Sequence, residues 1–201
     1  MKRKILKMLT AFSFAAVLTT SFSAVGVANA KNEQSDEISC AAKSAYVLDF
    51  DTGTVVYAKN ENEKLPIASM TKIMTASIIL DDVKAGKLNL SDEITVSEKA
   101  AGMGGSQVFL DANSTHTIKN LLKAVVIASA NDAAVALSEA ASGSEDAFVK
   151  RMNDKAEKLG LSNTNFVNAT GLPALNAYSS AKDVSYMLKN LLSHDEYFEF
   201  S

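Results

Sequence analysis

The stretch SMTKIMTASIILDDVK at residues 69–84 places apolar side chains three and four residues apart. They are Met70, Ile73, Met74, Ile78 and Ile79. This spacing is that of one face of an α-helix, so we expect a long buried helix over residues 69–84. Gly86 follows the stretch and suits the left-handed backbone that commonly ends a helix.

A serine and a lysine, Ser69 and Lys72, lie three residues apart at the start of this helix. Such positions share a helix face, so the Lys72 amine can reach Ser69 Oγ and serve as the base for a serine nucleophile. A lysine accepts a proton only when its ammonium form is disfavoured, and burial in an apolar helix has that effect. Alone, the Ser-x-x-Lys pattern is weak evidence for a catalytic site, because a capping serine beside a surface lysine explains it as well.

Two stretches before the helix, SAYVLDF at residues 44–50 and TVVYAK at residues 54–59, are rich in β-branched and aromatic residues. Asp51-Thr52-Gly53 separates them and is typical of a turn, with glycine where a positive φ is needed. We therefore expect a hairpin of two antiparallel strands. A lone hairpin is only marginally stable in water, so it needs other elements to pack against.

The rest of the chain is predicted to be mainly helical. After an irregular connector, with a short strand at residues 93–96 and a loop at residues 100–106, four stretches repeat apolar residues with helical period. These are residues 118–130, 132–141, 145–159 and 181–192. A chain of 201 residues without internal repeats or a linker predicts one domain of mixed α and β structure.

The junction of the first two of these helices carries Ser129-Ala130-Asn131. A Ser-x-Asn motif is the second element of a catalytic pattern that begins with Ser-x-x-Lys, and the pair is far more specific than either part. A turn between helices is a place where Ser129 and Asn131 can project into a cleft. An ordinary helix-breaking turn explains the backbone there but not the pairing of motifs.

The composition excludes several classes of protein. Hydrophobic residues make up 47% and charged residues 21% of the chain, which indicates a packed core. After residue 30 the sequence has 16 basic and 23 acidic side chains, so nucleic acid is not an expected partner. We expect no metal and no cofactor, because His116 and His194 lack companions at ligand spacing. The single cysteine, Cys40, cannot form an internal disulfide.

Residues 1–30 have the features of a secretory signal peptide. A cationic start is followed by a mostly apolar run at residues 8–27 and by Ala28-Asn29-Ala30, the small-x-small form that signal peptidase cuts. We expect cleavage after Ala30 and a protein that works outside the cytoplasmic membrane. An uncleaved N-terminal membrane anchor is the alternative.

Several longer blocks point to one family. They are YVLDFDTGTVVYAKN, LPIASMTKIMTA, GGSQVFL, LLKAVVIASANDAAVALSEAASGS, KRMNDKAEKLGLSNTNFVNATGLP and YSSAKDVSYML. In these blocks the sequence resembles the secreted serine D-alanyl-D-alanine carboxypeptidases, which are low-molecular-mass penicillin-binding proteins. The resemblance implies an α/β (α+β) fold of the β-lactamase/DD-peptidase type, in which helices flank an antiparallel sheet and an all-helical lobe is inserted.

The resemblance also implies roles for the motif residues. Ser69 would be the acylated nucleophile, Lys72 its general base, Ser129 a proton relay to the leaving amine, and Asn131 the group that holds the substrate's amide carbonyl. The substrate would be a peptidoglycan stem peptide that ends in D-Ala-D-Ala. β-Lactam antibiotics, which mimic this dipeptide, would acylate the same serine.

One motif of the family is absent from this sequence. The family carries Lys-Thr-Gly on a later strand, whereas Lys84-Ala85-Gly86 and Lys158-Leu159-Gly160 lie at predicted helix ends. The resemblance implies three further strands of the sheet and a C-terminal amphipathic anchor, which we expect to lie outside this sequence. We therefore expect a signal peptide at residues 1–30, a polar leader at residues 31–43 and, at residues 44–201, the first part of a longer catalytic domain with little activity by itself.

Two other interpretations remain open. A class A β-lactamase needs a deacylating glutamate in the loop after the Ser-x-Asn motif, and residues 165–173, NFVNATGLP, contain none. A non-catalytic, penicillin-binding fragment is the second alternative. It differs from the enzyme in releasing no D-alanine.

The first testable prediction concerns the N-terminus. We expect secreted protein to begin at or near Lys31, because signal peptidase cuts after the small-x-small motif. N-terminal sequencing of protein from the culture medium or cell wall measures this directly. Mature protein that still begins with Met1 and is inserted in the membrane would contradict the prediction.

Overall fold

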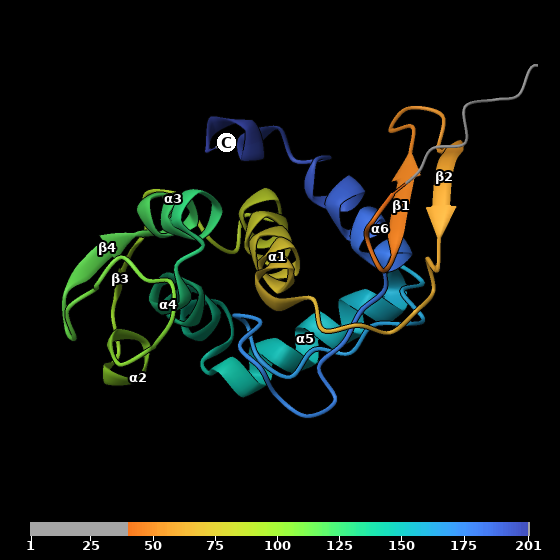
Figure 1. The fold of residues 1–201 in the computed structure, drawn as a ribbon. Helices are drawn as coiled ribbons and strands as arrows, with labels where there is room; N and C mark the ends of the chain where they lie inside the picture. The colour runs from red at the N-terminus through yellow and green to blue at the C-terminus, as the bar shows by residue number, and fades with distance from the viewer. Residues whose placement is uncertain (1–39, 201) are drawn as a thin grey trace, which may run out of the picture. The chain divides into compact units, whose positions relative to one another are not determined.

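The computed structural model describes residues 40–200 (Figure 1). The predicted signal peptide and most of the predicted polar leader lie outside the described residues. Within residues 40–200, no helix combines the length and the apolar character needed to cross a membrane.

The predicted hairpin is confirmed as strands β1 (Ala45–Leu48) and β2 (Val55–Lys59), which pair antiparallel. The strands are shorter than predicted because the turn already begins at Asp49. Its carboxylate accepts hydrogen bonds from the backbone N–H and the hydroxyl of Thr52, at 2.7 and 2.6 Å, and so holds the turn closed. Gly53 completes the turn with a φ of +71°.

One side of the hairpin packs on helix α6 (Ala181–Leu191), beside which it lies in Figure 1. The rings of Tyr46 on β1 and Tyr186 on α6 are 6.3 Å apart. Several other hairpin side chains are about half exposed in the described structure, namely Val47, Val55 and Val56.

The predicted long helix is the centre of the described structure. It consists of a short 3₁₀ turn, η1 (Ala68–Thr71), followed by helix α1 (Lys72–Lys84). Figure 1 shows α1 between α6 on one side and two further helices, α3 (Ile118–Ala128) and α4 (Asn131–Ser142), on the other. Because α1 contacts neighbours on most sides, nearly all of its residues are small, apolar or paired.

The start of this helix differs from the prediction in one respect. Residues 68–71 form a 3₁₀ helix where an α-helix was expected from residue 69. In a 3₁₀ helix, positions i and i+3 eclipse one another along the axis. Ser69 and Lys72 are therefore aligned by this turn.

The four predicted helices of the second half are confirmed as α3, α4, α5 (Glu145–Lys158) and α6. Side chains at the N-caps fix three of the four starts. Thr117, Ser144 and Ser180 each accept a hydrogen bond from a backbone N–H three residues further on, as N-caps do. Helix α3 ends two residues before the predicted limit, because Ser129 adopts a left-handed backbone with a φ of +53°.

Two short elements in the connector were missed. The predicted strand β3 (Glu93–Thr95) pairs antiparallel with β4 (Thr115–Thr117), and helix α2 (Glu98–Ala101) occupies the beginning of the predicted loop. Elements of three or four residues give almost no periodic signal, and these form because tertiary contacts hold them. Ser97, which caps α2, also donates a hydrogen bond to Glu139 of α4 at 2.7 Å.

A buried ion pair ties the helices together on the side of α5. Arg151 on α5 binds Asp82 on α1 at 2.6 Å, and Asp82 is only 3% exposed. The other guanidinium nitrogen donates to the backbone carbonyl of Ala141 and to the hydroxyl of Ser142, both at 2.9 Å. One side chain thus joins α1 and the C-terminal end of α4 to α5.

We expect Arg151→Ala to lower the free energy of unfolding by about 2–3 kcal/mol, because it leaves a buried carboxylate without its main partner. The matched control is Lys150→Ala on the same helix, at an exposed residue, with an expected change below about 0.5 kcal/mol. Urea unfolding followed by circular dichroism measures both. Equal effects of the two substitutions would show that the ion pair does not stabilise the fold.

Candidate active site

Ser69 and Lys72 form a close pair at the start of the central helix. Ser69 is exposed on η1, whereas Lys72 is only 5% exposed. The distance from Lys72 Nζ to Ser69 Oγ is 3.4 Å, and Nζ also donates a hydrogen bond to the backbone carbonyl of Thr170 at 2.8 Å. The longer contact is of the kind that tightens only when substrate binds.

The surroundings of Lys72 favour the neutral amine. Burial lowers the pKa of Lys72 from 10.5 to about 8. Within residues 40–200, no carboxylate oxygen forms an ion pair with Nζ, so no negative charge opposes the effect of burial. At pH 7 roughly a tenth of the molecules therefore carry the amine that can accept a proton.

The turn before Ser69 is strained. Ala68 has a φ of +46°, which is uncommon for a residue other than glycine. The backbone of Gly171 approaches Ala68 so closely that a Cβ at Gly171 would lie 1.9 Å from the Ala68 carbonyl oxygen. Only glycine fits there, so this contact requires Gly171 and fixes the turn that presents Ser69.

Ser69, Lys72 and Ser129 line one cavity of about 140 Å³. The other residues of its wall are Ile73, Ala76, Val125, Val126, Leu191 and Tyr197. Ser129 reaches this cavity from the C-terminal end of α3, where its left-handed backbone breaks the helix. The structure thus brings together three of the four predicted site residues.

Asn131, the fourth predicted residue, does not line this cavity. It is the first residue of α4 and is 4% exposed. Its side-chain amide donates to the carbonyl of Gly104 at 2.7 Å, and its backbone N–H donates to the carbonyl of Ser106, also at 2.7 Å. Asn131 therefore anchors the loop that follows α2.

Asp132 anchors the same loop further along. Its buried carboxylate accepts hydrogen bonds from the backbone N–H groups of Val108 and Leu110, both at 3.1 Å. Phe109 between them has a φ of +57° and a side chain that is 79% exposed. Sequence reasoning missed this role, because an aspartate in the first turn of a helix is unremarkable by itself.

Sequence reasoning also missed the contribution of Thr170. Its backbone carbonyl is the group that binds Lys72, and any residue type supplies such a group. The available signal was the turn-forming composition of Asn168-Ala169-Thr170-Gly171.

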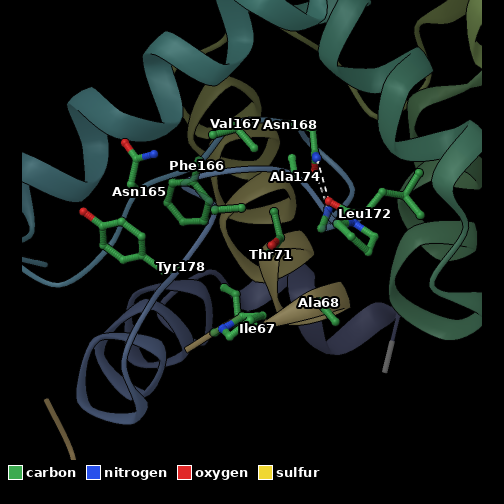
Figure 2. Close-up of a pocket in the computed structure, with 14 residues that line it drawn as sticks. Ile67, Ala68, Thr71, Asn165, Phe166, Val167, Asn168, Leu172, Ala174 and Tyr178 are labelled. Atoms are coloured by element: carbon green, nitrogen blue, oxygen red, sulfur yellow. Dashed lines mark hydrogen bonds between the residues drawn. The ribbon is translucent and has the colours of Figure 1, made fainter. Parts of the chain in front are cut away.

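A second cavity, of about 160 Å³, is shown in Figure 2. Ile67, Ala68 and Thr71 line one wall and the segment with Phe166 and Leu172 the other. Its lining contains neither Ser69 nor Lys72. Among residues 40–200, no group of three His, Cys, Asp or Glu side chains is placed to hold a metal ion.

Comparison with known proteins identifies the family. A family model described as D-alanyl-D-alanine carboxypeptidase matches residues 29–201. D-alanyl-D-alanine carboxypeptidase DacF of Bacillus subtilis is 44% identical over 196 residues, which cover 98% of this chain and 50% of that protein. DacC of Escherichia coli is 38% identical over 160 residues, which cover 77% of this chain and 40% of that protein.

Solved structures of proteins with the same kinds of name are also similar to this chain in fold. The D-alanyl-D-alanine carboxypeptidase DacD from Francisella tularensis matches with a TM-score of 0.76 and 35% identity, covering 77% of this chain and 38% of that one. A penicillin-binding protein from Listeria monocytogenes, solved in its ampicillin-bound form, matches with a TM-score of 0.69 and 32% identity. The match covers 79% of this chain and 65% of that one. The predicted α/β fold class of the DD-peptidases is confirmed.

The chain spans about half the length of the curated relatives it matches. The match to the family model nevertheless includes every described residue and all four predicted site residues. The chain belongs to the D-alanyl-D-alanine carboxypeptidase family.

Proposed function

We propose that this protein is a serine D-alanyl-D-alanine carboxypeptidase that removes the last D-alanine from peptidoglycan stem peptides. The observation that carries the proposal is the buried Lys72, whose pKa is lowered to about 8, within 3.4 Å of the exposed Ser69 hydroxyl. Such a pair is what a serine nucleophile needs when no histidine serves as its base.

The proposed reaction has two steps. The Lys72 amine takes the proton of Ser69, and Oγ attacks the carbonyl carbon of the penultimate D-alanine. The peptide bond then breaks, Ser129 passes its proton to the departing amine and is reprotonated by the Lys72 ammonium, and D-alanine leaves. The neutral Lys72 amine then takes a proton from water, which attacks the acyl carbonyl, and the proton returns to Ser69 Oγ as the ester bond breaks and frees the shortened peptide.

Asn131 has one amide hydrogen in its bond to Gly104, which leaves the second for a substrate. We assign it to the carbonyl of the substrate's amide, as the family's Ser-x-Asn motif implies. Its burial and its two bonds to the loop after α2 hold the amide group in place. The same loop would then form one side of the substrate site.

β-Lactams are proposed as a second class of ligand for Ser69. The relative from Listeria monocytogenes, solved with ampicillin, supports this proposal. A β-lactam ring opens on attack by Oγ and keeps its leaving nitrogen attached, so the acyl-enzyme persists. Because peptidoglycan and β-lactams are met outside the cytoplasmic membrane, we also propose export directed by residues 1–30.

A class A β-lactamase is not favoured by the loop at residues 165–173, which contains no carboxylate. The oxygen of the Asn168 side chain is engaged by backbone N–H groups within its own turn. It is therefore not free to orient a deacylating water.

The test of the proposed function is acylation of Ser69. We expect a labelled penicillin to modify Ser69 alone in the full-length protein, because Ser69 is exposed beside Lys72, whose pKa is lowered to about 8. Ser77, which accepts a hydrogen bond from Lys155 at 2.6 Å, is only 1% exposed and is out of reach of a ligand. Tryptic mass spectrometry locates the adduct, and release of D-alanine from a D-Ala-D-Ala peptide separates an enzyme from a fragment that only binds. An adduct on Ser129, or full labelling of Ser69→Ala, would overturn the assignment.

The pH dependence tests the role of Lys72. Because the amine is the active form and the pKa of Lys72 is about 8, the acylation rate should rise about tenfold per pH unit below pH 8 and level off above it. Lys72→Ala should slow acylation by roughly three to four powers of ten and abolish this rise. A wild-type rate that stays constant from pH 6 to pH 9, measured with a fluorescent penicillin, would exclude Lys72 as the base.

A further inference from the structure

The strongest contact of the Lys72 amine is to a turn that lies 98 residues further along the chain. Nζ donates to the Thr170 carbonyl at 2.8 Å, and Thr170 is only 1% exposed. A neutral amine has two hydrogens and one lone pair. When one hydrogen binds Thr170, the lone pair is free to face Ser69 Oγ, so the direction of this carbonyl decides where the base points.

We propose that Asn168 is a positioning residue, which holds the Thr170–Gly171 peptide group so that its carbonyl faces Lys72. The proposal rests on the proposed function, in which Lys72 is the base. Asn168 Oδ1 accepts a hydrogen bond from the Gly171 N–H at 2.7 Å, and this N–H belongs to the same peptide group as the Thr170 carbonyl.

Because the peptide bond is planar, a hydrogen bond to its N–H also fixes the direction of its carbonyl. In a trans peptide the N–H and the C=O point in opposite directions within one plane. Asn168 holds the N–H end and Lys72 binds the C=O end, so the three groups form one chain of hydrogen bonds. Such chains polarise one another and strengthen the bonds within them.

Asn168 makes further bonds that fix the turn around this peptide group. Its Oδ1 also accepts hydrogen bonds from the backbone N–H and the hydroxyl of Thr170, each at 3.2 Å. Its amide nitrogen donates to the Leu172 carbonyl at 2.9 Å, on the wall of the cavity in Figure 2. Four bonds from one side chain thus span residues 170–172.

The Thr170–Gly171 peptide group needs these hydrogen bonds to Asn168, because the backbone freedom of Gly171 would otherwise allow the group to rotate. Gly171 has a φ of +83°, in a region where glycine meets little steric resistance. A rotation of the Thr170–Gly171 plane would turn an N–H toward the Lys72 amine in place of the carbonyl. Asn168 opposes this rotation by holding the N–H on the far side.

The neighbouring peptide groups have their own anchors, so the loop should survive loss of Asn168. The Ala169 N–H donates to Glu145 Oε1 at 3.0 Å, and the Ala169 carbonyl accepts from Thr75 Oγ1 at 2.8 Å. Glu145 is in turn paired with Lys99 at 2.7 Å. These bonds do not involve the Asn168 side chain.

The experiment compares Asn168→Leu, Asn168→Asp and the matched control Asn165→Leu in the full-length protein. Leucine has a similar size but accepts no hydrogen bond, whereas aspartate keeps an oxygen for the Gly171 N–H and adds a negative charge. Asn165 lies in the same loop, but its amide binds the Asn176 carbonyl at 2.7 Å and not the Thr170–Gly171 group. Acylation by a fluorescent penicillin from pH 6 to pH 10 and a thermal melt are measured for each.

We expect Asn168→Leu to lower the acylation rate at its high-pH plateau roughly 10- to 100-fold, the size of effect that a small misplacement of a reacting group produces. Asn168→Asp should restore most of this plateau, and its charge should move the midpoint of the pH profile above that of the wild type. Asn165→Leu should leave both unchanged. A normal plateau in Asn168→Leu, or an equal loss in Asn165→Leu, would overturn the proposal.

A second readout separates this proposal from the proposed function. The pKa of Lys72 is followed by NMR of labelled lysine, with the signal assigned through Lys72→Arg. A downward shift of that pKa in Asn168→Leu but not in Asn165→Leu, because the amine loses the Thr170 carbonyl as a partner, supports the positioning role even if the wild type is not acylated, in which case the proposed function alone fails. If Asn168→Leu does not fold, the Asn168→Asp profile decides, and an unchanged Lys72 pKa in that variant overturns the proposal.

Discussion

The burial of Lys72 without a carboxylate partner is the constraint on which the rest of the structure depends. An ammonium group removed from water needs polar partners, and a carboxylate would stabilise it so well that it could not act as a base. Here the partners are a backbone carbonyl and the Ser69 hydroxyl, both uncharged. The pKa of Lys72 therefore stays near 8, and the amine is populated close to neutral pH.

This constraint explains the arrangement of the core. Helix α1 has to be enclosed on most sides to desolvate Lys72 at its first position, and four helices supply that enclosure. The loop after α5 has to reach the same end of α1 to supply the carbonyl of Thr170. The close approach of Gly171 to Ala68 follows from this, together with the left-handed backbone of Ala68. Strain of this kind persists only where the surrounding contacts over-determine it.

The sequence predicted those features that local patterns encode. Helix starts such as Ile118 and Ala181 were found because apolar periodicity marks them, and the structure adds a capping hydroxyl before each. The contact between Ser69 and Lys72 followed from their spacing, whereas the approach of Ser129 was expected only from a known pairing of motifs. The role of Thr170 could not be predicted, because its backbone carbonyl, which every residue type has, binds a residue 98 positions earlier in the chain. Strand β4 was also missed, because three residues are too few to show a period and the strand forms only through its pairing with β3.

The two serines of the cavity approach Lys72 from helix ends of opposite polarity. Ser69 precedes the N-terminus of α1, where unpaired N–H groups carry a partial positive charge that favours a developing oxyanion. Ser129 terminates α3, where the last carbonyls carry a partial negative charge that favours a protonated group. The fields of the two helix ends therefore favour a proton near Ser129 over one near Ser69. The two helices thus give the proposed proton relay its direction, from the nucleophile toward the leaving amine.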